Sequence, residues 1–359
     1  MKQSSRDSEK PDCFVAPLPA RRREMIPPPE HPRIPPRKVG VLLLNLGTPD
    51  SPEPGAVRIY LREFLSDPRV IEIPYLVWQP ILRGIVLRTR PKKSAHAYKQ
   101  VWSDEGSPLA AITARQARAL AGTWGDGVVV DHAMRYGRPT IAERIDALKA
   151  QGCERILLAP LYPQYCAATT ATANDSAFRH LATLRWQPAI RTLPPYHDDP
   201  LYIGALKAVL ERELAALDFE PDALVASFHG MPERTLELGD PYHCHCQKTA
   251  RLLGEAMRRE LIVSFQSRFG RAKWLGPATD ATLAELPAKG VRKVAIFAPG
   301  FSADCLETLE ELAIRGRESF EEAGGTRFAY LPCLNDSEEG MNMLRALLSR
   351  ELEGWIGAQ

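Results

Sequence analysis

The chain has 359 residues, enough for two domains of ordinary size or one large α/β unit. Its composition, 45% hydrophobic and 25% charged, is that of a soluble globular protein that can bury a substantial core. A formal net charge of +2 gives no electrostatic reason to expect a nucleic-acid partner.

The first 37 residues are predicted to form a disordered tail. They hold 9 of the 31 prolines and a basic run at positions 21–23, with almost no apolar periodicity. Acidic residues at positions 7, 9 and 12 argue against a mitochondrial transit peptide, and the lack of an apolar h-region argues against a secretory signal. Seven scattered cysteines, an odd count, then fit a cytoplasmic location with mostly free thiols.

From Lys38 onward, short apolar runs alternate with amphipathic stretches. Buried strands are predicted at 39–45, 127–137, 155–165, 223–230, 261–267 and 291–301. Helices are predicted near 54–65, 139–152, 169–183 and 337–353. Apolar strands that alternate with helices indicate parallel sheets covered on both faces, so the fold class is α/β.

The alternation occurs in two series, which predicts two Rossmann-like domains at 38–195 and 196–334. The segment LPPYHDDP, residues 193–200, is the expected linker, and residues 335–359 are expected to form a helix that folds back on the first domain. No G-x-G-x-x-G fingerprint follows the first strand, and no Walker A sequence is present. Neither a dinucleotide nor ATP is therefore expected as a cofactor.

The most apolar stretch, residues 73–87, is interrupted by Pro74, Pro80 and Arg83 and is too short to span a bilayer. It runs into the basic cluster RTRPKK, residues 88–93. An apolar face beside a basic cluster suits a surface that touches a membrane or an amphipathic ligand. It suits equally a helix that packs on the core and has a solvated basic end, so both interpretations stay open.

Polar residues follow three of the predicted strands, at the carboxyl ends where open α/β sheets bind ligands. They are His229, the pair Arg135 and Tyr136, and the acidic residues Asp304, Glu307 and Glu311. On an α-helix the three acidic positions share one face, and a row of carboxylates beside a histidine could abstract protons or conduct a hard cation. Each also has an ordinary interpretation, as a hydrogen-bonded loop histidine, an ion-paired arginine or acids that cap a helix.

The segment DPYHCHCQKT, residues 240–249, carries four metal-ligand side chains at consecutive positions. Structural zinc sites draw ligand pairs from separate segments, and four adjacent residues cannot wrap one tetrahedral ion without backbone strain. The favoured interpretation is a turn into the following helix, with the thiols packed as small apolar groups. The alternative is a [2Fe–2S] cluster, which requires Cys166 and Cys333 to converge on Cys244 and Cys246.

Six separated motifs, in order between Val39 and Asn335, resemble those of the ferrochelatase family, which inserts ferrous iron into a porphyrin at the end of haem synthesis. The motifs are VGVLLLNLGTPDSPE, VWSDEGSPL, LYPQY, SFHGMPERTLELGDPY, FQSRFGRAKWLGPATDATL and PGFSADCLETLEEL. The resemblance implies two Rossmann-like domains with a porphyrin cleft between them. It also implies that protoporphyrin IX and ferrous iron are the substrates.

The resemblance assigns roles residue by residue. His229 matches the family's active-site histidine, and Glu307 matches its partner carboxylate across the macrocycle. The expected metal-contacting residues are His229, Glu307, Asp304 and Glu311. The residues that match substrate-pocket positions are Leu46, Ser107, Arg135, Tyr136, Trp274 and Phe301. A neutral histidine is suited to accept the pyrrole protons, and carboxylates can help to strip water from Fe²⁺.

Two alternative functions remain open: a chelatase for another tetrapyrrole such as coproporphyrin, and a non-catalytic porphyrin or haem carrier. A carrier has no use for a base opposite an acidic row, so the presence of His229 and Glu307 favours the enzyme. Some family members carry a [2Fe–2S] cluster on a cysteine-rich C-terminal extension, but no cysteine follows Cys333 here. The resemblance further implies peripheral contact with the membrane and with the oxidase that precedes the enzyme in haem synthesis.

Overall fold

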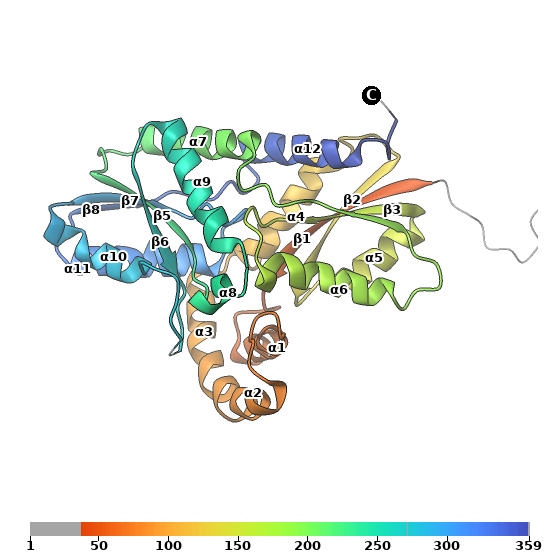
Figure 1. The fold of residues 1–359 in the computed structure, drawn as a ribbon, viewed down its shortest axis with the longest axis horizontal. Helices are drawn as coiled ribbons and strands as arrows, with labels where there is room; N and C mark the ends of the chain where they lie inside the picture. The colour runs from red at the N-terminus through yellow and green to blue at the C-terminus, as the bar shows by residue number, and fades with distance from the viewer. Residues whose placement is uncertain (1–36, 271, 358–359) are drawn as a thin grey trace, which may run out of the picture. The chain divides into compact units, whose positions relative to one another are not determined.

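Two four-stranded sheets organise the protein, whose computed structural model describes residues 37–270 and 272–357 (Figure 1). The first sheet has the order β2-β1-β3-β4, and its neighbouring strands are all parallel. Its strands are β1 (Lys38–Gly47), β2 (Val128–Tyr136), β3 (Cys153–Pro160) and β4 (Ala189–Thr192). The predicted tail 1–37, except for Arg37, lies outside the described residues.

The second sheet has the order β6-β5-β7-β8 and is also parallel throughout. Its strands are β5 (Ala223–His229), β6 (Leu261–Gln266), β7 (Lys293–Phe297) and β8 (Arg327–Tyr330). The predicted α/β class with two Rossmann-like parallel sheets is therefore confirmed. The expected boundary near residue 195 falls between β4 and the next helix, which begins at Pro200.

Helices connect the strands in both halves. In the first half they are α1 (Pro54–Leu65), α2 (Tyr75–Ile81), the π-helix η1 (Leu82–Val86), α3 (Leu87–Val101), α4 (Pro108–Leu120), α5 (Ile141–Ala150), the π-helix η2 (Ala167–Ala171) and α6 (Thr172–Leu181). In the second half they are α7 (Pro200–Ala215), α8 (Glu233–Glu237), α9 (Tyr242–Met257), α10 (Thr279–Glu285), the 3₁₀-helix η3 (Pro287–Lys289), the π-helix η4 (Glu307–Gly316), α11 (Arg317–Glu322) and α12 (Glu338–Leu352).

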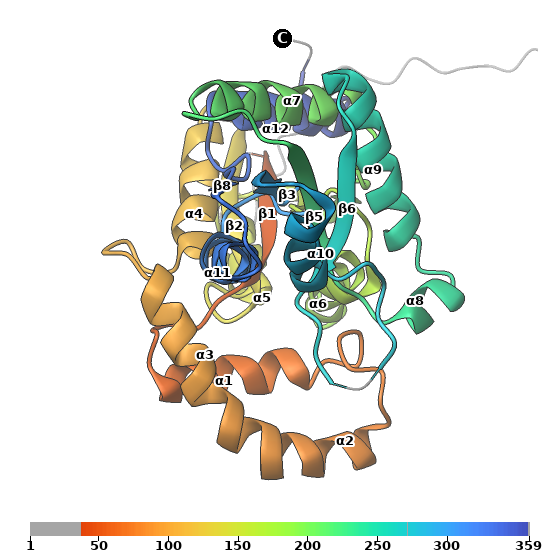
Figure 2. The ribbon, with the colours of Figure 1, turned by 90° about the vertical axis from the view of Figure 1, so that its left-hand side faces the viewer.

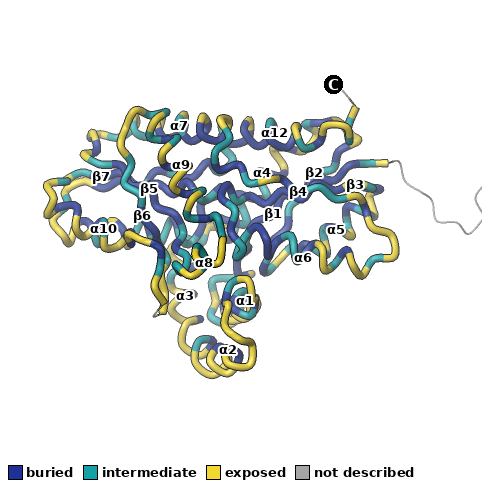
Figure 3. The backbone as a smooth tube through the Cα atoms, in the orientation of Figure 1, coloured by how far each residue is buried: buried dark blue, intermediate teal, exposed yellow. Residues whose placement is uncertain are grey.

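Alternate residues of the central strand β1 face two different cores, because successive side chains of a strand point to opposite faces. Leu42 and Leu44 pack in a core that belongs to the first half alone. Val41 and Leu43 pack in a second core that also contains Phe228 of β5. One face of each sheet therefore contributes to a single shared core, which appears as a continuous buried layer in Figure 3.

The last helix, α12, lies beside α7 in both views and contacts α4 and β3 of the first half (Figures 1 and 2). Leu344 and Leu348 of this helix enter the shared core. At the end of α12, a guanidinium nitrogen of Arg191 in β4 donates hydrogen bonds to the carbonyl oxygens of Glu351 and Glu353, at 2.5 and 2.9 Å. The chain's last helix is thus fixed to the first sheet as well as to the second half.

Helices α1 to α3 form a separate helical layer below the two sheets (Figure 2). Their own apolar cluster contains Val57, Leu65 and Leu82, and it packs against Tyr136 at the end of β2. The outer surface of α2 is strongly exposed, and Leu76 is 86% accessible to solvent. Among the described residues, no helix combines the length and hydropathy needed to cross a bilayer.

Candidate active site

His229 is the last residue of β5, and its ring is held in one tautomer by a backbone contact. The Nδ1 atom lies 2.7 Å from the carbonyl oxygen of Gly230. A carbonyl oxygen can only accept a hydrogen bond, so Nδ1 must carry the proton in the neutral ring. Nε2 then keeps its lone pair and can accept a proton from a bound molecule.

The glycine after this histidine is required by the close approach of β6. Its backbone N–H donates to the carbonyl oxygen of Gln266 at 2.7 Å, and a Cβ atom at Gly230 would lie only 2.4 Å from that oxygen. Real Cβ atoms do not come this close to backbone oxygen, so any other residue would push β5 and β6 apart. The short loop after His229 therefore fixes the position of the imidazole.

Gln266, at the end of β6, links the histidine strand to the acidic helix. It pairs in register with His229, and its side-chain nitrogen donates to the carbonyl oxygen of Glu307 at 2.9 Å. Its side-chain oxygen accepts a hydrogen bond from Ser227 at 2.7 Å. The sequence prediction did not include this residue, although a polar side chain that ends the apolar run LIVSF was a visible signal.

Glu307 begins η4, and the expected α-helical row of carboxylates is wrong in its geometry. The segment is a π-helix, in which hydrogen bonds span five residues, and Asp304 precedes it. The Glu307 carboxylate lies close to two buried groups, Cys305 and Tyr98. Burial and, after it, the charge of Glu307 raise the pKa values of both groups, so both stay protonated.

Asp304 is buried and hydrogen-bonded to other side chains. Its carboxylate accepts hydrogen bonds from Thr308 and Tyr330 and from the side-chain amide of Asn335, at 2.6 Å in the last case. The Asn335 oxygen in turn accepts from the Asp304 backbone N–H at 2.8 Å. These contacts explain Asp304 as a residue that anchors the start of η4, and the metal contact expected at Asp304 stays a prediction.

Glu311 is also occupied by its neighbours. Its two carboxylate oxygens accept hydrogen bonds from the backbone N–H and the hydroxyl of Ser267, at 2.7 and 2.6 Å. Ser267 has a backbone φ of 64°, an uncommon conformation for a residue other than glycine. Glu311 therefore fixes the strained turn after β6. Of Asp304, Glu307 and Glu311, only Glu307 has no side-chain hydrogen bond to a residue distant in the sequence among the described residues, since its carboxylate contacts the neighbouring Cys305 thiol.

The predicted apolar pocket residues Leu46 and Phe301 come from different halves and pack on the same small cluster. The Phe301 ring lies 6.5 Å from the ring of His229. Leu109 of α4 belongs to this cluster, and Ser107, the buried N-cap of α4, stands directly before it. Three of the predicted pocket positions thus lie on elements that meet at one apolar cluster beside the histidine.

Trp274 lies against the loop that follows His229. It forms an isolated backbone bridge with Pro232, and its ring packs 5.1 Å from Phe269. The indole N–H is buried and has no hydrogen-bond partner among the described residues. An unsatisfied buried donor at this place could serve a ligand, since such groups cost free energy when they remain unpaired.

Arg135 and Tyr136, at the end of β2, are bound into a buried network around Asp67. Arg135 forms an ion pair with Asp67 and donates to the Thr172 hydroxyl, and Tyr136 donates to Asp67 at 2.9 Å. Burial opposes ionisation of Asp67, but the hydrogen bonds from Thr172 and from the Arg69 N–H, with the charge of Arg135, hold its pKa below the ordinary value. The surroundings of Arg135 are those of the alternative interpretation, in which it is an ion-paired arginine.

Residues 242–249 of the segment DPYHCHCQKT form the first turns of α9, and Asp240 and Pro241 precede it, so the helix begins earlier than predicted. Successive residues of a helix point in different directions, which separates the four potential ligands. Cys244 is exposed and Cys246 is buried, whereas His245 stacks on His197 with ring centroids 3.6 Å apart. Burial and, after it, His245 lower the pKa of His197 to about 4, so this ring is neutral at pH 7.

The four cysteines named for an iron–sulfur cluster do not form a ligand set. Cys333 lies in the core of the second half, with Sγ 3.9 Å from the Ala298 carbonyl oxygen. Cys166 and Cys246 belong to the shared core, and Cys244 faces solvent. Across residues 37–270 and 272–357, no three His, Cys, Asp or Glu side chains are grouped to hold a metal. The donors present therefore do not fit a [2Fe–2S] cluster.

Comparison with solved structures identifies the fold first. Sirohydrochlorin chelatase SirB from Bacillus subtilis subspecies spizizenii, in complex with cobalt, aligns with a TM-score of 0.51 at 13% identity over 88% of this chain and 97% of its own. SirB from Bacillus subtilis with Fe³⁺ aligns with a TM-score of 0.52 at 14% identity over 89% and 97% of the two chains. At such identities the likeness concerns the fold alone, which is that of the chelatases.

The sequence comparisons are more specific. The model of the ferrochelatase family matches residues 38–352. Ferrochelatases from Agrobacterium fabrum and Rhizobium meliloti are each 56% identical to this chain, over 92% and 91% of its length and 98% of theirs. The chain belongs to the ferrochelatase family.

Proposed function

We propose that the protein inserts ferrous iron into protoporphyrin IX to form protohaem, the last step of haem biosynthesis. Membership of the ferrochelatase family supports iron insertion into a porphyrin. The single observation that carries the residue assignment is the Nδ1 contact of His229, because it leaves Nε2 as a proton acceptor at the end of a rigid strand.

The reaction releases two pyrrole protons as Fe²⁺ takes their place in the macrocycle. In the proposed mechanism, Nε2 of His229 accepts these protons one after the other and passes them to solvent. A histidine is suited to this task because its charge changes near neutral pH. The neighbouring Phe301 ring offers an apolar surface for one side of the porphyrin.

Glu307 is the proposed iron-contacting carboxylate. Fe²⁺ arrives hydrated, and a carboxylate can replace bound water while the metal moves to the pyrrole nitrogens. Gln266 holds the backbone of Glu307 without using its carboxylate, and this arrangement supports the role. Asp304 and Glu311 act at one remove, since their oxygens anchor the start of η4 and the turn after β6.

Bending of the flat macrocycle exposes a nitrogen lone pair to the metal, and complementarity to the bent form accelerates insertion. Leu46, Phe301 and Trp274 are the proposed apolar contacts for this form. Ser107, at the start of α4, is the proposed polar contact on the first half. Arg135 and Tyr136 are proposed to support the substrate wall through the Asp67 network.

The test is an anaerobic assay with purified protein, Fe²⁺ and protoporphyrin IX in detergent and without nucleotide. We expect the porphyrin spectrum to convert to that of haem with many turnovers per protein molecule. Coproporphyrin in a parallel reaction distinguishes the alternative substrate, which is supported if it turns over faster. Binding of porphyrin at one equivalent without metal insertion indicates a carrier and contradicts the proposal.

We also propose a cytoplasmic location with peripheral contact to the membrane through α2, η1 and the start of α3, where the oxidase can deliver the porphyrin. Exposed apolar side chains on α2 stand beside the basic residues of α3. Arg88, Arg90, Lys92 and Lys93 are all exposed, and the Arg90 guanidinium also lies 5.1 Å over the Phe269 ring. Changing all four residues to Glu should weaken binding to anionic vesicles by at least about 10²-fold, since each basic residue contributes about 1 kcal/mol. Unchanged vesicle binding contradicts this contact.

A further inference from the structure

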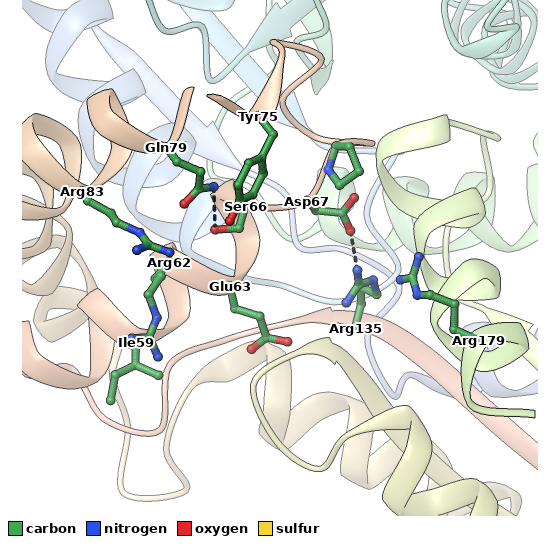
Figure 4. Close-up of a pocket in the computed structure, with 11 residues that line it drawn as sticks. Ile59, Arg62, Glu63, Ser66, Asp67, Tyr75, Gln79, Arg83, Arg135 and Arg179 are labelled. Atoms are coloured by element: carbon green, nitrogen blue, oxygen red, sulfur yellow. Dashed lines mark hydrogen bonds and ion pairs between the residues drawn. The ribbon is translucent and has the colours of Figure 1, made fainter. Parts of the chain in front are cut away.

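A pocket of about 600 Å³ lies between α1, α2 and η1 on one side and β2 and α6 on the other (Figure 4). Its charged lining residues are Arg62, Glu63, Asp67, Arg83, Arg135 and Arg179. Arg135 is the only predicted substrate-pocket residue among its lining residues. We call this feature the arginine pocket.

The arginine pocket has an excess of positive charge. Its four arginines face two carboxylates, which leaves a formal excess of two positive charges. Asp67 is already paired with Arg135, and Glu63 accepts a hydrogen bond from the backbone N–H of Gly137 at 3.0 Å. In Figure 4, Arg62 and Arg83 stand at one end of the pocket and Arg179 stands beside Arg135 at the other.

Three of these arginines have no charge partner. Within the described part of the chain, no carboxylate oxygen lies within 4.0 Å of the side-chain nitrogens of Arg62, Arg83 or Arg179. The two carboxylates of the arginine pocket, Asp67 and Glu63, are engaged with Arg135 and Gly137. Like charges gathered around one pocket repel one another, and an anion between them removes that cost. Guanidinium groups also present paired N–H donors that match the oxygens of a phosphate.

The rim of the same pocket is apolar and exposed. Ile59 and Tyr75 line it, and each remains at least 60% accessible to solvent. Leu76, Val77 and Ile85 continue this apolar surface along α2 and η1. A soluble anion accounts for the arginines alone. An anion attached to acyl chains accounts for both the charge and the apolar rim.

We propose that the arginine pocket binds the headgroup phosphate of an anionic glycerophospholipid, with the acyl chains against Tyr75 and the apolar surface of α2. The inference rests on the membrane contact proposed above and adds a specific lipid site to it. A phosphate monoester carries close to two negative charges at pH 7, which matches the formal excess in the pocket. Phosphatidic acid should therefore bind more tightly than a diester lipid.

The test compares vesicles of phosphatidylcholine mixed with phosphatidic acid or with phosphatidylglycerol, at equal surface charge. Wild-type protein should prefer the phosphatidic acid vesicles. The variant Arg62→Gln/Arg83→Gln/Arg179→Gln should lose this preference and bind about 10²-fold more weakly, because three basic contacts are removed. Arg58→Gln, an exposed arginine of the same helix outside the pocket, should retain the preference.

Two further measurements separate this inference from its alternatives. Replacement of Arg88, Lys92 and Lys93 by Gln should weaken binding to both vesicle types and keep the preference. Iron insertion in detergent should be unchanged in the arginine-pocket variant. A variant that loses the lipid preference but keeps full turnover has a defect in the lipid site and not in the chelatase site. If the triple variant does not fold, the single variant Arg83→Gln is used, since Arg83 is exposed.

Three outcomes overturn the inference but leave the membrane contact in place. The first is equal binding of wild-type protein to the two vesicle types. The second is an unchanged preference in the arginine-pocket variants. The third is competition by glycerol 3-phosphate at the concentration at which lipid binds, because it assigns the pocket to a soluble phosphate. A wild-type protein that binds no vesicle but inserts iron removes the membrane contact and this site, and leaves the chelatase proposal intact.

Discussion

Polar residues end a strand in each of the two sheets, but they differ in how far the protein occupies their hydrogen-bonding groups. At the end of β2, Arg135 and Tyr136 are fully engaged with a buried carboxylate, Asp67. At the end of β5, the backbone occupies only one ring nitrogen of His229 and leaves the other available. Both groups lie at strand carboxyl ends, where ligands bind in open α/β sheets. Of the two, His229 has a ring nitrogen whose lone pair is free to accept a proton. Unused hydrogen-bonding capacity therefore distinguishes a reactive residue from a supporting one.

The largest expected effect comes from disrupting the Asp67 network at the end of β2. Asp67→Asn keeps the shape of the side chain but leaves the buried Arg135 without a counter-charge. Removing one partner of a buried ion pair costs about 3–5 kcal/mol, so the free energy of unfolding should fall by this amount at pH 7. Urea unfolding measures it, and Asp50→Asn, an exposed position, is the matched control. A loss no larger than that of the control contradicts a supporting role for this network.

The pH dependence gives a second view of the same residue. Because the folded state lowers the pKa of Asp67, its stabilising contribution is complete above the unfolded pKa, about 3.9, and is lost as the pH falls through the lower folded value. The difference in unfolding free energy between wild type and Asp67→Asn should stay constant from pH 7 to about pH 5 and shrink at lower pH. A difference that grows on acidification has the wrong sign for this assignment.

The next effect concerns His229 at the end of β5. His229→Ala removes the proposed proton acceptor and should lower the rate of iron insertion at least about 10²-fold, the lower end for a general base. The melting temperature should change little, because the only side-chain hydrogen bond described for His229 is to its neighbour Gly230. His96→Ala, an exposed histidine on α3, serves as the control. Near-wild-type turnover by His229→Ala removes this residue from the mechanism.

A smaller effect is expected at Gln266, whose side chain forms hydrogen bonds with both β5 and η4. Gln266→Met retains the length of the side chain but loses the hydrogen bonds to Glu307 and Ser227. The hydrogen bond to Glu307 contributes about 1 to 1.5 kcal/mol net, so its loss should lower kcat about tenfold and leave the KM for porphyrin unchanged. Gln151→Met at the end of α5 is the control. An equal rise in KM would instead indicate direct contact with the substrate.

The smallest effect is expected from the tail. Deleting residues 1–37 should leave the melting temperature and the turnover in detergent unchanged, since a Pro-rich segment without apolar periodicity buries little surface. Differential scanning calorimetry on the truncated protein checks this. A fall of several degrees shows that the tail contributes to the packing of the two sheets.

Elements with strong local signals could be predicted from the sequence. Helix α1 has the predicted bounds 54–65, and the apolar run at 39–45 is the middle of β1. The edge strands β4 and β8 were not predicted, because four residues in a strand give too short an apolar pattern. The π-helical form of η4 was missed as well, since its amphipathic sequence is equally typical of an α-helix.

The site was predicted less completely, because hydrogen bonds between distant residues decide which carboxylates are free. Asp304 is bound by Tyr330 and Asn335, which are 26 and 31 residues away in the sequence. Glu311 is bound by Ser267, 44 residues away. Nothing in the spacing of the three acidic residues shows that, within residues 37–270 and 272–357, only Glu307 lacks a side-chain hydrogen bond to a distant residue.

The shared core has a consequence for how the protein is made. The chain leaves the ribosome from its N-terminus, so β1 is synthesised long before α12. Val41 and Leu43 nevertheless share their core with Leu344 and Leu348 of that last helix. One face of the first sheet therefore stays incompletely covered until translation is nearly finished. A nascent chain stalled before residue 338 exposes apolar surface on α4, α7 and β3, and we expect chaperones to bind it.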